Sequence, residues 1–358
     1  MFLYIMNQIR KKKDMDISLF DYYLPEELIA QEPSKVRDEC KLLAVNKEAK
    51  TFEDKIFKDI IDYFKPGDVL VRNNTKVIPA RLFGTKDKTG AHVEVLLLKD
   101  LGNDIWECLC GNAKAIKVDT KIHFKDDILV GTCLGVFDEG IRHIKFIYKG
   151  IFLEELDKIG LMPLPPYIHK ECNEDDKSDY QTVYAKVSGS AAAPTAGFHF
   201  TNELLEKIQN KGIEVLDITL NIGLGTFRPV KVQDTKDHIM HSETYEIREE
   251  VASKLNKAKS EGRRIIAVGT TAVRTLESNF NKFNKFEAER STTSIFISPG
   301  YEYKAIDCLI TNFHLPKSTL VMLVSAFMGR EFTLECYKHA VDKKYRFFSY
   351  GDSMFIYK

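Results

Sequence analysis

Several short polar segments of this 358-residue chain carry side chains that could bind a ligand or transfer a proton. Gly269, Thr270 and Thr271 follow an apolar run and precede a helical pattern that contains Arg274 and Glu277. Backbone N–H groups and hydroxyls at the start of a helix suit a phosphate, a carboxylate or a nucleoside hydroxyl. Taken alone, the segment also fits a helix start with ordinary capping residues.

A second segment, residues 221–230, reads Asn-Ile-Gly-Leu-Gly-Thr-Phe-Arg-Pro-Val. Its two glycines are not a dinucleotide-binding fingerprint, because the third glycine and the following helix are absent. The segment could wrap a small ligand, and a plain tight turn is the alternative. Its candidate ligand-binding residues are Gly223, Gly225, Thr226 and Arg228.

A third segment, residues 311–319, contains Asn312, His314 and Ser318 and is constrained by a proline. Imidazole titrates near neutral pH, so a histidine in a loop after a strand is a candidate for proton transfer. A structural role for the same histidine is the alternative. His199 lies in a comparable position, immediately before a helical pattern.

His241, Glu243 and Asp352 complete the set of candidate catalytic residues. The His-x-x-His spacing that ends at His241 is short for one helix face, and no metalloprotease motif is present. We therefore expect no metal ion, and read these side chains as solvated or as facing a substrate.

Apolar runs of strand length alternate with helical patterns along most of the chain, which is typical of a sheet covered by helices. The helices are predicted at residues 54–64, 201–211, 249–261, 272–280, 319–328 and 331–343, and the strands at 69–71, 214–220, 264–268, 305–310 and 346–350. Residues 279–294 are polar and are expected to form a mobile loop. The fold class is α/β, a three-layer, mostly parallel sheet with helices on both faces. Because ligands bind beyond the carboxyl ends of such strands, we expect the polar segments to meet at one sheet edge.

Residues 81–150 have a different texture, with short runs of β-forming residues separated by turn clusters. The runs are at residues 81–85, 92–98, 105–110, 121–124, 130–137 and 141–148. They leave no room for crossover helices and predict a small six-stranded antiparallel β-barrel. The predicted organisation is an N-terminal extension at 1–15, an α/β catalytic domain at 16–80 and 151–358, and the barrel inserted at 81–150.

The composition limits the cellular context and the partners. Lys and Arg total 52 and Asp and Glu total 52, so a nucleic-acid partner would have to meet a local basic patch. Seven cysteines are too sparse for a disulfide scaffold. The longest apolar run is shorter than the roughly 20 residues of a membrane span, and the first residues do not fit a secretory signal. These features predict a soluble cytoplasmic protein with no membrane partner.

Ten segments match, in order, the motifs of a known family. They read LPEELIAQEP (24–33), TKVIPARL (75–82), MPLPPYI (162–168), YQTVYA (180–185), GSAAAPTAGFHFT (189–201), GLGTFRPV (223–230), MHSE (240–243), AVGTTAVRTLES (267–278), TNFHLPKSTL (311–320) and YRFFSYGD (345–352). From about residue 16 to its end, the chain strongly resembles the bacterial S-adenosylmethionine:tRNA ribosyltransferase-isomerases of queuosine biosynthesis. The fold that this resemblance implies, an α/β domain with an inserted barrel, agrees with the pattern above.

The resemblance implies transfer and isomerisation of the ribosyl group of S-adenosylmethionine onto 7-aminomethyl-7-deazaguanine at the wobble position of a tRNA. The product is epoxyqueuosine in tRNA, and adenine and methionine are released. S-adenosylmethionine is then a substrate, and tRNA carrying the deazaguanine precursor is the partner. No bound cofactor and no metal are expected, and the family resemblance suggests a monomer.

The implied reaction needs a base for a ribose C5′ hydrogen, an acid for the departing adenine, and a neutral aminomethyl group. Our hypothesis is that His199 and His314 lead as acid–base groups, with His241 third. The supporting acids would be Glu243, Glu277 and Asp352, which could orient a base or balance the sulfonium charge. The implied substrate-binding residues are Gly223, Gly225, Thr226, Arg228, Gly269, Thr270, Thr271, Arg274, Glu277, Asn312 and Ser318.

Two kinds of basic residue are assigned to anions. Arg228 and Arg274 could hold the methionine carboxylate or an RNA phosphate, since a guanidinium forms two parallel hydrogen bonds with either group. Within the barrel, four lysines outnumber the single Asp119 of the same stretch and form the patch that we assign to tRNA phosphates. They are Lys114, Lys117, Lys121 and Lys125, and a solvated surface is the ordinary alternative for such a run.

The chain departs from the family pattern at three places. Asn221 stands where a histidine is usual, so this position cannot be an acid–base group here. Asn74 replaces a usual aspartate, and Gly111-Asn112 replaces a usual Arg-Pro pair that is presumed to contact RNA.

Two other functions fit parts of the sequence. An α/β enzyme acting on a free nucleotide or sugar phosphate would use residues 269–271 as a phosphate-binding site and would convert its substrate without RNA. A non-catalytic RNA-binding module would bind tRNA whether or not S-adenosylmethionine is present. The motifs fall in sheet-edge loops rather than on buried strands, which argues against both.

Overall fold

The structure is a computed structural model that describes residues 15–170, 172–223, 234–235 and 240–358. Of the predicted extension at residues 1–15, only Met15 falls in this range. The candidate residues Gly225, Thr226 and Arg228 lie outside the described residues.

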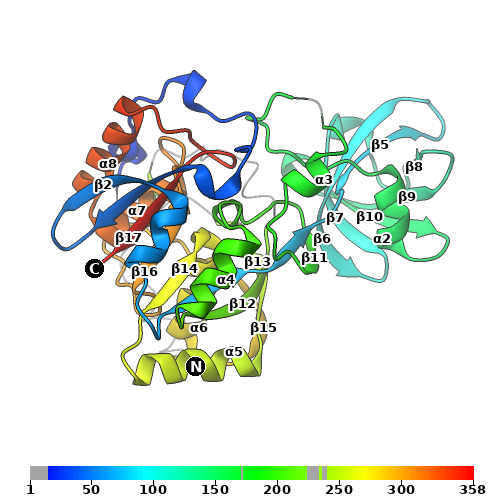
Figure 1. Ribbon diagram of the computed structural model, residues 1–358. Coiled ribbons are helices and arrows are strands. Elements are labelled where there is room, and N and C mark those ends of the chain that lie inside the picture. The colour runs from blue at the N-terminus through cyan, green and yellow to red at the C-terminus, as the bar shows by residue number, and fades with distance from the viewer. Residues whose placement is uncertain (1–14, 171, 224–233, 236–239) are drawn as a thin grey trace.

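A nine-stranded mixed sheet forms the centre of the α/β domain, with the strand order β15-β13-β12-β3-β14-β16-β17-β1-β2 (Figure 1). Its strands are β1 (Lys41–Asn46), β2 (Thr51–Ile56), β3 (Val69–Asn73), β12 (Glu214–Asn221), β13 (Glu243–Ile247), β14 (Ile265–Val268), β15 (Glu289–Thr293), β16 (Cys308–Asn312) and β17 (Ser353–Tyr357). The central neighbours β12, β3, β14 and β16 are parallel, and β1 is parallel to β17. Antiparallel pairings join β17 to β16 and add β2, β13 and β15 at the edges. The α/β class is confirmed, with parallel strands at the centre of the sheet.

Helices cover both faces of this sheet, because successive side chains of a strand point to opposite faces. In β3, Val69 and Val71 join one hydrophobic cluster and Leu70 joins the other. The first cluster contains side chains of α5 (Glu249–Ser260), α6 (Gly269–Phe283), α7 (Thr319–Met328) and α8 (Arg330–Asp342). The second contains side chains of α4 (Asn202–Asn210) and of the 3-10 helix η4 (Phe57–Tyr63). These are the three layers that the sequence predicts.

Six antiparallel strands close into a barrel with the order β10-β7-β6-β5-β8-β9, which confirms the predicted inserted barrel (Figure 1). They are β5 (Arg81–Lys86), β6 (His92–Gly102), β7 (Ile105–Cys110), β8 (Lys121–Phe124), β9 (Leu129–Val136) and β10 (Ile141–Tyr148). The barrel core continues past residue 150 into α2 (Phe152–Ile159), where Leu156 is fully buried. The Trp106 ring stacks on Phe152 with centroids 5.4 Å apart.

Short elements connect the two domains. The strands β4 (Thr75–Val77) and β11 (Val187–Ser190) form a two-stranded parallel sheet, and β11 also contacts β6 of the barrel and β12 of the large sheet. The other short elements are α3 (Asp176–Asp179) and the 3-10 helices η1 (Ile17–Phe20), η2 (Glu26–Leu28), η3 (Arg37–Glu39), η5 (Ala113–Ala115), η6 (Asp138–Gly140) and η7 (Thr195–Gly197). Within the described residues, every helix is too short or too polar to span a bilayer.

Three local predictions were wrong. The helix predicted at 54–64 is only the 3-10 helix η4, because β2 extends to Ile56. The polar residues 279–294 are not a mobile loop, since α6 continues to Phe283 and β15 follows. The Asn279 side chain joins these two elements by donating to the carbonyl oxygen of Glu287 and to Glu289 Oε1, both at 3.0 Å.

The last strand is also displaced from its predicted position at residues 346–350. That segment forms a tight turn in which Phe348 has φ +73°. Gly351 leaves no space for a side chain, since a Cβ there would lie 2.5 Å from the carbonyl carbon of Phe347. The strand β17 therefore begins only at Ser353.

Candidate active site

The polar segments found in the sequence meet at one edge of the large sheet. The strands β12, β3, β14 and β16 are parallel, so their carboxyl ends lie side by side. The last residues of these strands are Asn221, Asn73, Val268 and Asn312. Gly223, residues 269–271 and residues 312–314 therefore lie at the expected shared edge, whereas residues 224–228 of the same expected set lie outside the described residues.

The 3-10 helix η7 connects two of these loops across the edge. Thr195 Oγ1 lies 3.5 Å from Oδ1 of Asn312, the last residue of β16. On the other side, a Cβ placed on Gly269 would lie 3.4 Å from Ala196 Cβ, so the start of α6 approaches η7 closely. Gly197 is equally confined, because a Cβ there would lie 2.0 Å from Tyr184 Oη. The small residues Ala196 and Gly197 thus permit close approach of the neighbouring segments.

The N-terminus of α6 presents unsatisfied donors at this edge. Gly269 begins the helix with φ +83°, a left-handed conformation that favours glycine. The Thr271 Oγ1 atom is buried and has no hydrogen-bond partner among the described residues. Arg274 lies three positions further along the same helix face. A buried polar group without a partner is rare in proteins and indicates a ligand or another unmet role.

Arg274 is paired on one side only. It is 8% exposed, and its Nη1 donates to Glu243 Oε2, the carboxylate of a residue that is 5% exposed. Glu243 Oε1 lies 3.5 Å from the backbone N–H of Gly223, so the ion pair also reaches the loop after β12. In the described part of the chain, Nε and Nη2 of Arg274 have no partner. These two atoms form one edge of the guanidinium, the edge that binds a carboxylate with two parallel hydrogen bonds.

His199 is 4% exposed and contacts Phe57, with ring centroids 5.1 Å apart, and the thiol of Cys40. The distance from Cys40 Sγ to His199 Nδ1 is 3.1 Å. Burial lowers the pKa of His199 to about 3, although the neighbouring Asn312 amide opposes part of this shift. The imidazole is therefore neutral at physiological pH.

His314 is held mainly through its backbone. Its N–H donates to Tyr337 Oη at 3.2 Å, and its carbonyl oxygen accepts from Tyr22 Oη. The ring atom Nε2 lies 2.8 Å from Thr311 Oγ1. Burial lowers the pKa of His314 to about 3, so this imidazole is also neutral at physiological pH.

The side chains of three candidate residues, Asp352, Glu277 and Ser318, accept hydrogen bonds that hold neighbouring backbone segments in place. Asp352 accepts from the N–H groups of Lys41 at 2.9 Å and Arg346 at 2.7 Å, and burial raises its pKa. Glu277 is fully buried and accepts from the backbone of residues 304–306 and from Tyr301 Oη at 2.8 Å. Ser318 caps α7 by accepting from the Val321 N–H at 3.3 Å. The structure gives each of them a role in holding loops together at or behind the sheet edge.

His241 is exposed and lines a cavity of 610 Å³ between the barrel and the α/β domain. The α/β side of this cavity includes Asn221, Gly223 and Glu243, so the cavity adjoins the sheet edge. The barrel side includes Trp106 and the acidic residues Asp100, Asp104 and Glu107. This volume is within the range of small-ligand sites in proteins.

The three departures from the family pattern have structural partners. Asn74 Oδ1 accepts from Thr219 Oγ1 at 2.7 Å, and Asn221 Oδ1 accepts from Thr75 Oγ1 at 2.8 Å. Asn112 adopts a left-handed conformation with φ +52°. A proline cannot take this value because its ring fixes φ near −65°, so the backbone of this loop differs from what Arg-Pro would allow.

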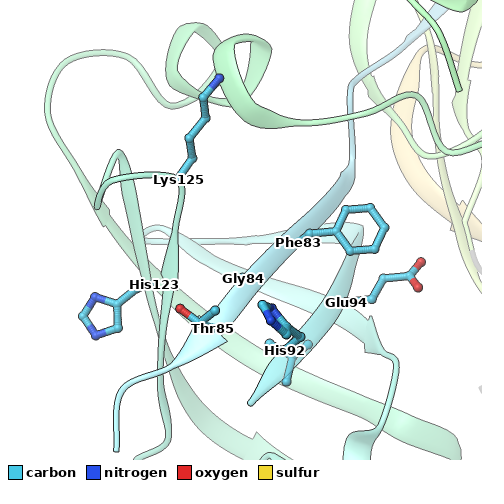
Figure 2. A pocket seen from close by; sticks show the side chains of 8 residues that line it. Phe83, Gly84, Thr85, His92, Glu94, His123 and Lys125 are labelled. Carbon is cyan, nitrogen blue, oxygen red and sulfur yellow. The ribbon is translucent and has the colours of Figure 1, made fainter. Parts of the chain in front are cut away.

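The four barrel lysines Lys114, Lys117, Lys121 and Lys125 are all exposed. Lys125 borders a surface hollow of 470 Å³, and its Nζ donates to the Lys158 carbonyl oxygen at 3.1 Å. Figure 2 shows Phe83 and Glu94 on one side of this hollow and His123 on the other. His123 Nδ1 lies 2.6 Å from Asp127 Oδ1, which places acidic and basic groups together near Lys125.

The sequence reasoning missed two residues that position this machinery. Cys40 is 159 residues from His199 and gave no motif signal. Arg142 is 5% exposed and donates to the carbonyl oxygens of Ile116 at 2.9 Å and Ala113 at 2.5 Å, which holds the Lys114–Lys117 loop against the barrel. Neither contact could be inferred from local spacing.

Among the described residues, no group of three or more His, Cys, Asp and Glu side chains is arranged to hold a metal ion.

Within the described residues, a buried arginine with an unpaired guanidinium edge lies near a helix start at the carboxyl edge of the sheet, which is the position where α/β enzymes typically bind their ligands. Comparison of the chain with known proteins identifies its family. The family model described as "Queuosine biosynthesis protein" matches residues 17–356, and the chain belongs to this family. The crystal structure of S-adenosylmethionine tRNA ribosyltransferase from Thermotoga maritima is similar, with 36% sequence identity and a TM-score of 0.53. That match covers 94% of this chain and 99% of the other.

Proposed function

We propose that this protein is the S-adenosylmethionine:tRNA ribosyltransferase-isomerase of queuosine biosynthesis. It transfers and isomerises the ribosyl group of S-adenosylmethionine onto 7-aminomethyl-7-deazaguanine at the wobble position of tRNA, and it releases adenine and methionine. The observation that carries the proposal is the convergence of the family's loops at one sheet edge, in a chain that matches the family from residue 17 to 356. A protein acting on tRNA is placed in the cytoplasm, and we expect it to act as a monomer.

The free edge of Arg274 is assigned to the methionine carboxylate of S-adenosylmethionine. Among the residues that the structure describes, the Nε and Nη2 atoms of Arg274 have no partner, Thr271 Oγ1 lies one turn before them, and the N-terminal end of α6 favours an anion. Glu243 neutralises the guanidinium from the opposite side, which fixes its orientation. The RNA phosphate that the sequence left as an alternative suits this site less well, because Arg274 is buried.

The sequence led us to expect His199 and His314 as the leading acid–base groups, with His241 third, and we now propose that they contact the reacting nucleoside. Both leading imidazoles are neutral at physiological pH, because burial lowers each pKa to about 3. A neutral imidazole can donate a hydrogen bond or accept a proton, but it is not a strong acid. Protonation of the departing adenine therefore needs a second group or water.

The cavity between the domains is assigned to the wobble nucleoside. It adjoins the sheet edge through Gly223 and Glu243, and its volume of 610 Å³ accommodates a nucleoside. An enzyme acting on an RNA base gains access by extruding the nucleotide from its stack. The exposed lysines Lys114 and Lys117 are assigned to nearby phosphates of the tRNA.

The decisive experiment incubates the protein with S-adenosylmethionine and tRNA that carries the deazaguanine precursor, and measures free adenine and methionine. Release of both, dependent on the modified tRNA, is the expected result. Turnover of S-adenosylmethionine or of a free nucleotide without RNA would favour the small-molecule enzyme instead.

The double substitution His199→Ala and His314→Ala should abolish adenine release. Wild-type turnover in that variant would contradict the assignment of the two histidines.

A further inference from the structure

Cys40 and His199 make a buried thiol–imidazole contact that the proposed roles above do not use. Cys40 lies directly before β1, and His199 lies two residues after η7. The Sγ and Nδ1 atoms are 3.1 Å apart, and the two residues are 5% and 4% exposed. Phe57 packs against the other side of the contact, with its ring centroid 5.1 Å from that of His199.

The contact holds one shared proton, and the chemistry of the two groups decides which atom carries it. Burial and the nearby Asp352 carboxylate raise the pKa of the Cys40 thiol, and burial lowers the pKa of His199 to about 3. Both shifts favour the neutral thiol and the neutral imidazole over a thiolate–imidazolium pair. An unprotonated imidazole nitrogen is a strong acceptor, whereas sulfur is a weak one, so the S–H donates to Nδ1.

The second ring nitrogen must then carry the proton of the neutral imidazole. His199 Nε2 is buried and has no hydrogen-bond partner among the described residues. The neighbouring Asn312 is oriented by its own contact, since its Nδ2 donates to the Phe348 carbonyl oxygen at 2.9 Å. This leaves Asn312 Oδ1 as an acceptor beside Thr195 Oγ1, and hydrogen bonding between the Asn312 side chain and His199 opposes part of the lowering of the His199 pKa.

We propose that Cys40 is a positioning residue that holds His199 as the neutral tautomer protonated at Nε2. In this state His199 presents an N–H donor to an uncharged acceptor atom, a ring nitrogen or ribose oxygen, of the nucleoside substrate. This part of the inference rests on the proposed function, whereas the tautomer itself does not. No proton is transferred, so the base that removes the ribose hydrogen is a different group.

A neutral imidazole that is held in one tautomer is an established hydrogen-bond donor in active sites. The contact with Cys40 is effective because it satisfies Nδ1 inside an apolar pocket, where an unpaired nitrogen would be costly. Serine can make the same donation through its hydroxyl, whereas alanine cannot. This difference separates positioning from simple packing.

The tautomer can be read directly by NMR of the whole protein labelled with ¹⁵N-histidine, with the His199→Asn variant used to assign the signal. We expect Nε2 protonated and Nδ1 unprotonated, with no change from pH 8 to pH 5. A proton on Nδ1 in the wild-type protein would overturn the proposal. Because this measurement needs no substrate, the tautomer can be confirmed even if the proposed reaction fails.

Steady-state kinetics with S-adenosylmethionine and precursor tRNA test the consequence. We expect Cys40→Ala to lower kcat about five- to tenfold, the effect of one lost hydrogen bond, with the KM for S-adenosylmethionine nearly unchanged. Cys40→Ser should restore most of kcat. Cys336→Ala, which truncates an equally buried thiol in α8, is the matched control and should keep wild-type kcat. Wild-type kcat in Cys40→Ala, or no rescue in Cys40→Ser when that variant is folded, would overturn the positioning role.

Discussion

Glu243 on β13 and Arg274 on α6 form a buried ion pair across 31 residues of sequence. The pair uses one carboxylate oxygen and one guanidinium nitrogen, so part of each group is left for other contacts. The remaining carboxylate oxygen faces the loop after β12, at Gly223. The remaining guanidinium edge is next to the N-terminus of α6. The pair thus connects the loop, the helix start and the cavity between the domains.

Removing the carboxylate of Glu243 should destabilise the fold. A buried guanidinium that loses its counter-charge keeps its desolvation cost, and breaking such a pair typically costs about 3–5 kcal/mol. We expect Glu243→Ala to lower the free energy of unfolding by an amount in this range, measured by chemical denaturation at pH 7. Glu246→Ala, on the same strand and with a side chain 40% exposed, is the control and should change stability little.

Replacing Arg274 by lysine should weaken binding of S-adenosylmethionine. Lysine keeps the positive charge and can still pair with Glu243, but it lacks the second pair of donors that we assign to the methionine carboxylate. We expect Arg274→Lys to raise the KM for S-adenosylmethionine about tenfold, with a smaller effect on kcat.

The matched control for this substitution is Arg263→Lys. Arg263 also joins an ion pair with a glutamate, Glu214 at 3.2 Å, but it lies at the opposite, amino-terminal edge of the same sheet. It should leave the KM for S-adenosylmethionine unchanged. Equal effects of the two substitutions on KM would show that Arg274 acts through stability rather than through the ligand.

The barrel and the ligand-bearing edge could be predicted because both depend on local patterns. Turn clusters recur between short runs of β-forming residues, and each predicted barrel strand overlaps an observed one from β5 to β10. The edge follows from topology, since loops after parallel strands must lie together. Segment 311–319 was correctly placed at the edge by this argument alone.

The individual roles could not be predicted because they depend on contacts between distant residues. Asp352 follows the last apolar run and resembles a catalytic acid in the sequence, yet it accepts from Lys41, which is 311 residues away. Glu277 lies one turn beyond Arg274, but it points to the backbone of residues 304–306. The tight turn before β17 depends on Asp352 and on the crowding at Gly351, so the strand could not be placed from composition.

The lowered pKa values of His199 and His314 should make the fold acid-sensitive at mildly acidic pH. Their pKa values are lowered from 6.5 to about 3, so between these values the unfolded chain binds more protons than the folded one. The free energy of unfolding therefore falls as the pH falls below 6.5, by up to about 1.4 kcal/mol per pH unit for each histidine. Chemical denaturation between pH 7 and pH 5 measures this slope.

The substitution His314→Gln tests the source of the slope. It removes one titrating group, so the dependence between pH 6.5 and pH 5 should become shallower by about 1 kcal/mol per pH unit. The raised pKa values of Asp352 and Glu277 act in the opposite direction, because the folded state then binds protons more tightly. An unchanged slope in His314→Gln would contradict the lowered pKa of this residue.

Reversing charge on the barrel should weaken tRNA binding in a salt-dependent way. Lys114 and Lys117 are exposed on the loop that Arg142 holds against the barrel. If each neutralises one phosphate, Lys114→Glu with Lys117→Glu should lower affinity and reduce the slope of log K against log salt concentration by about 1.5. The control reverses Lys257 and Lys338, exposed lysines on α5 and α8, and so changes the net charge equally. Binding measured by filter retention at several salt concentrations separates the two. A loss of slope in both double variants would indicate a general charge effect, whereas an unchanged slope in the barrel variant would rule out these lysines as phosphate contacts.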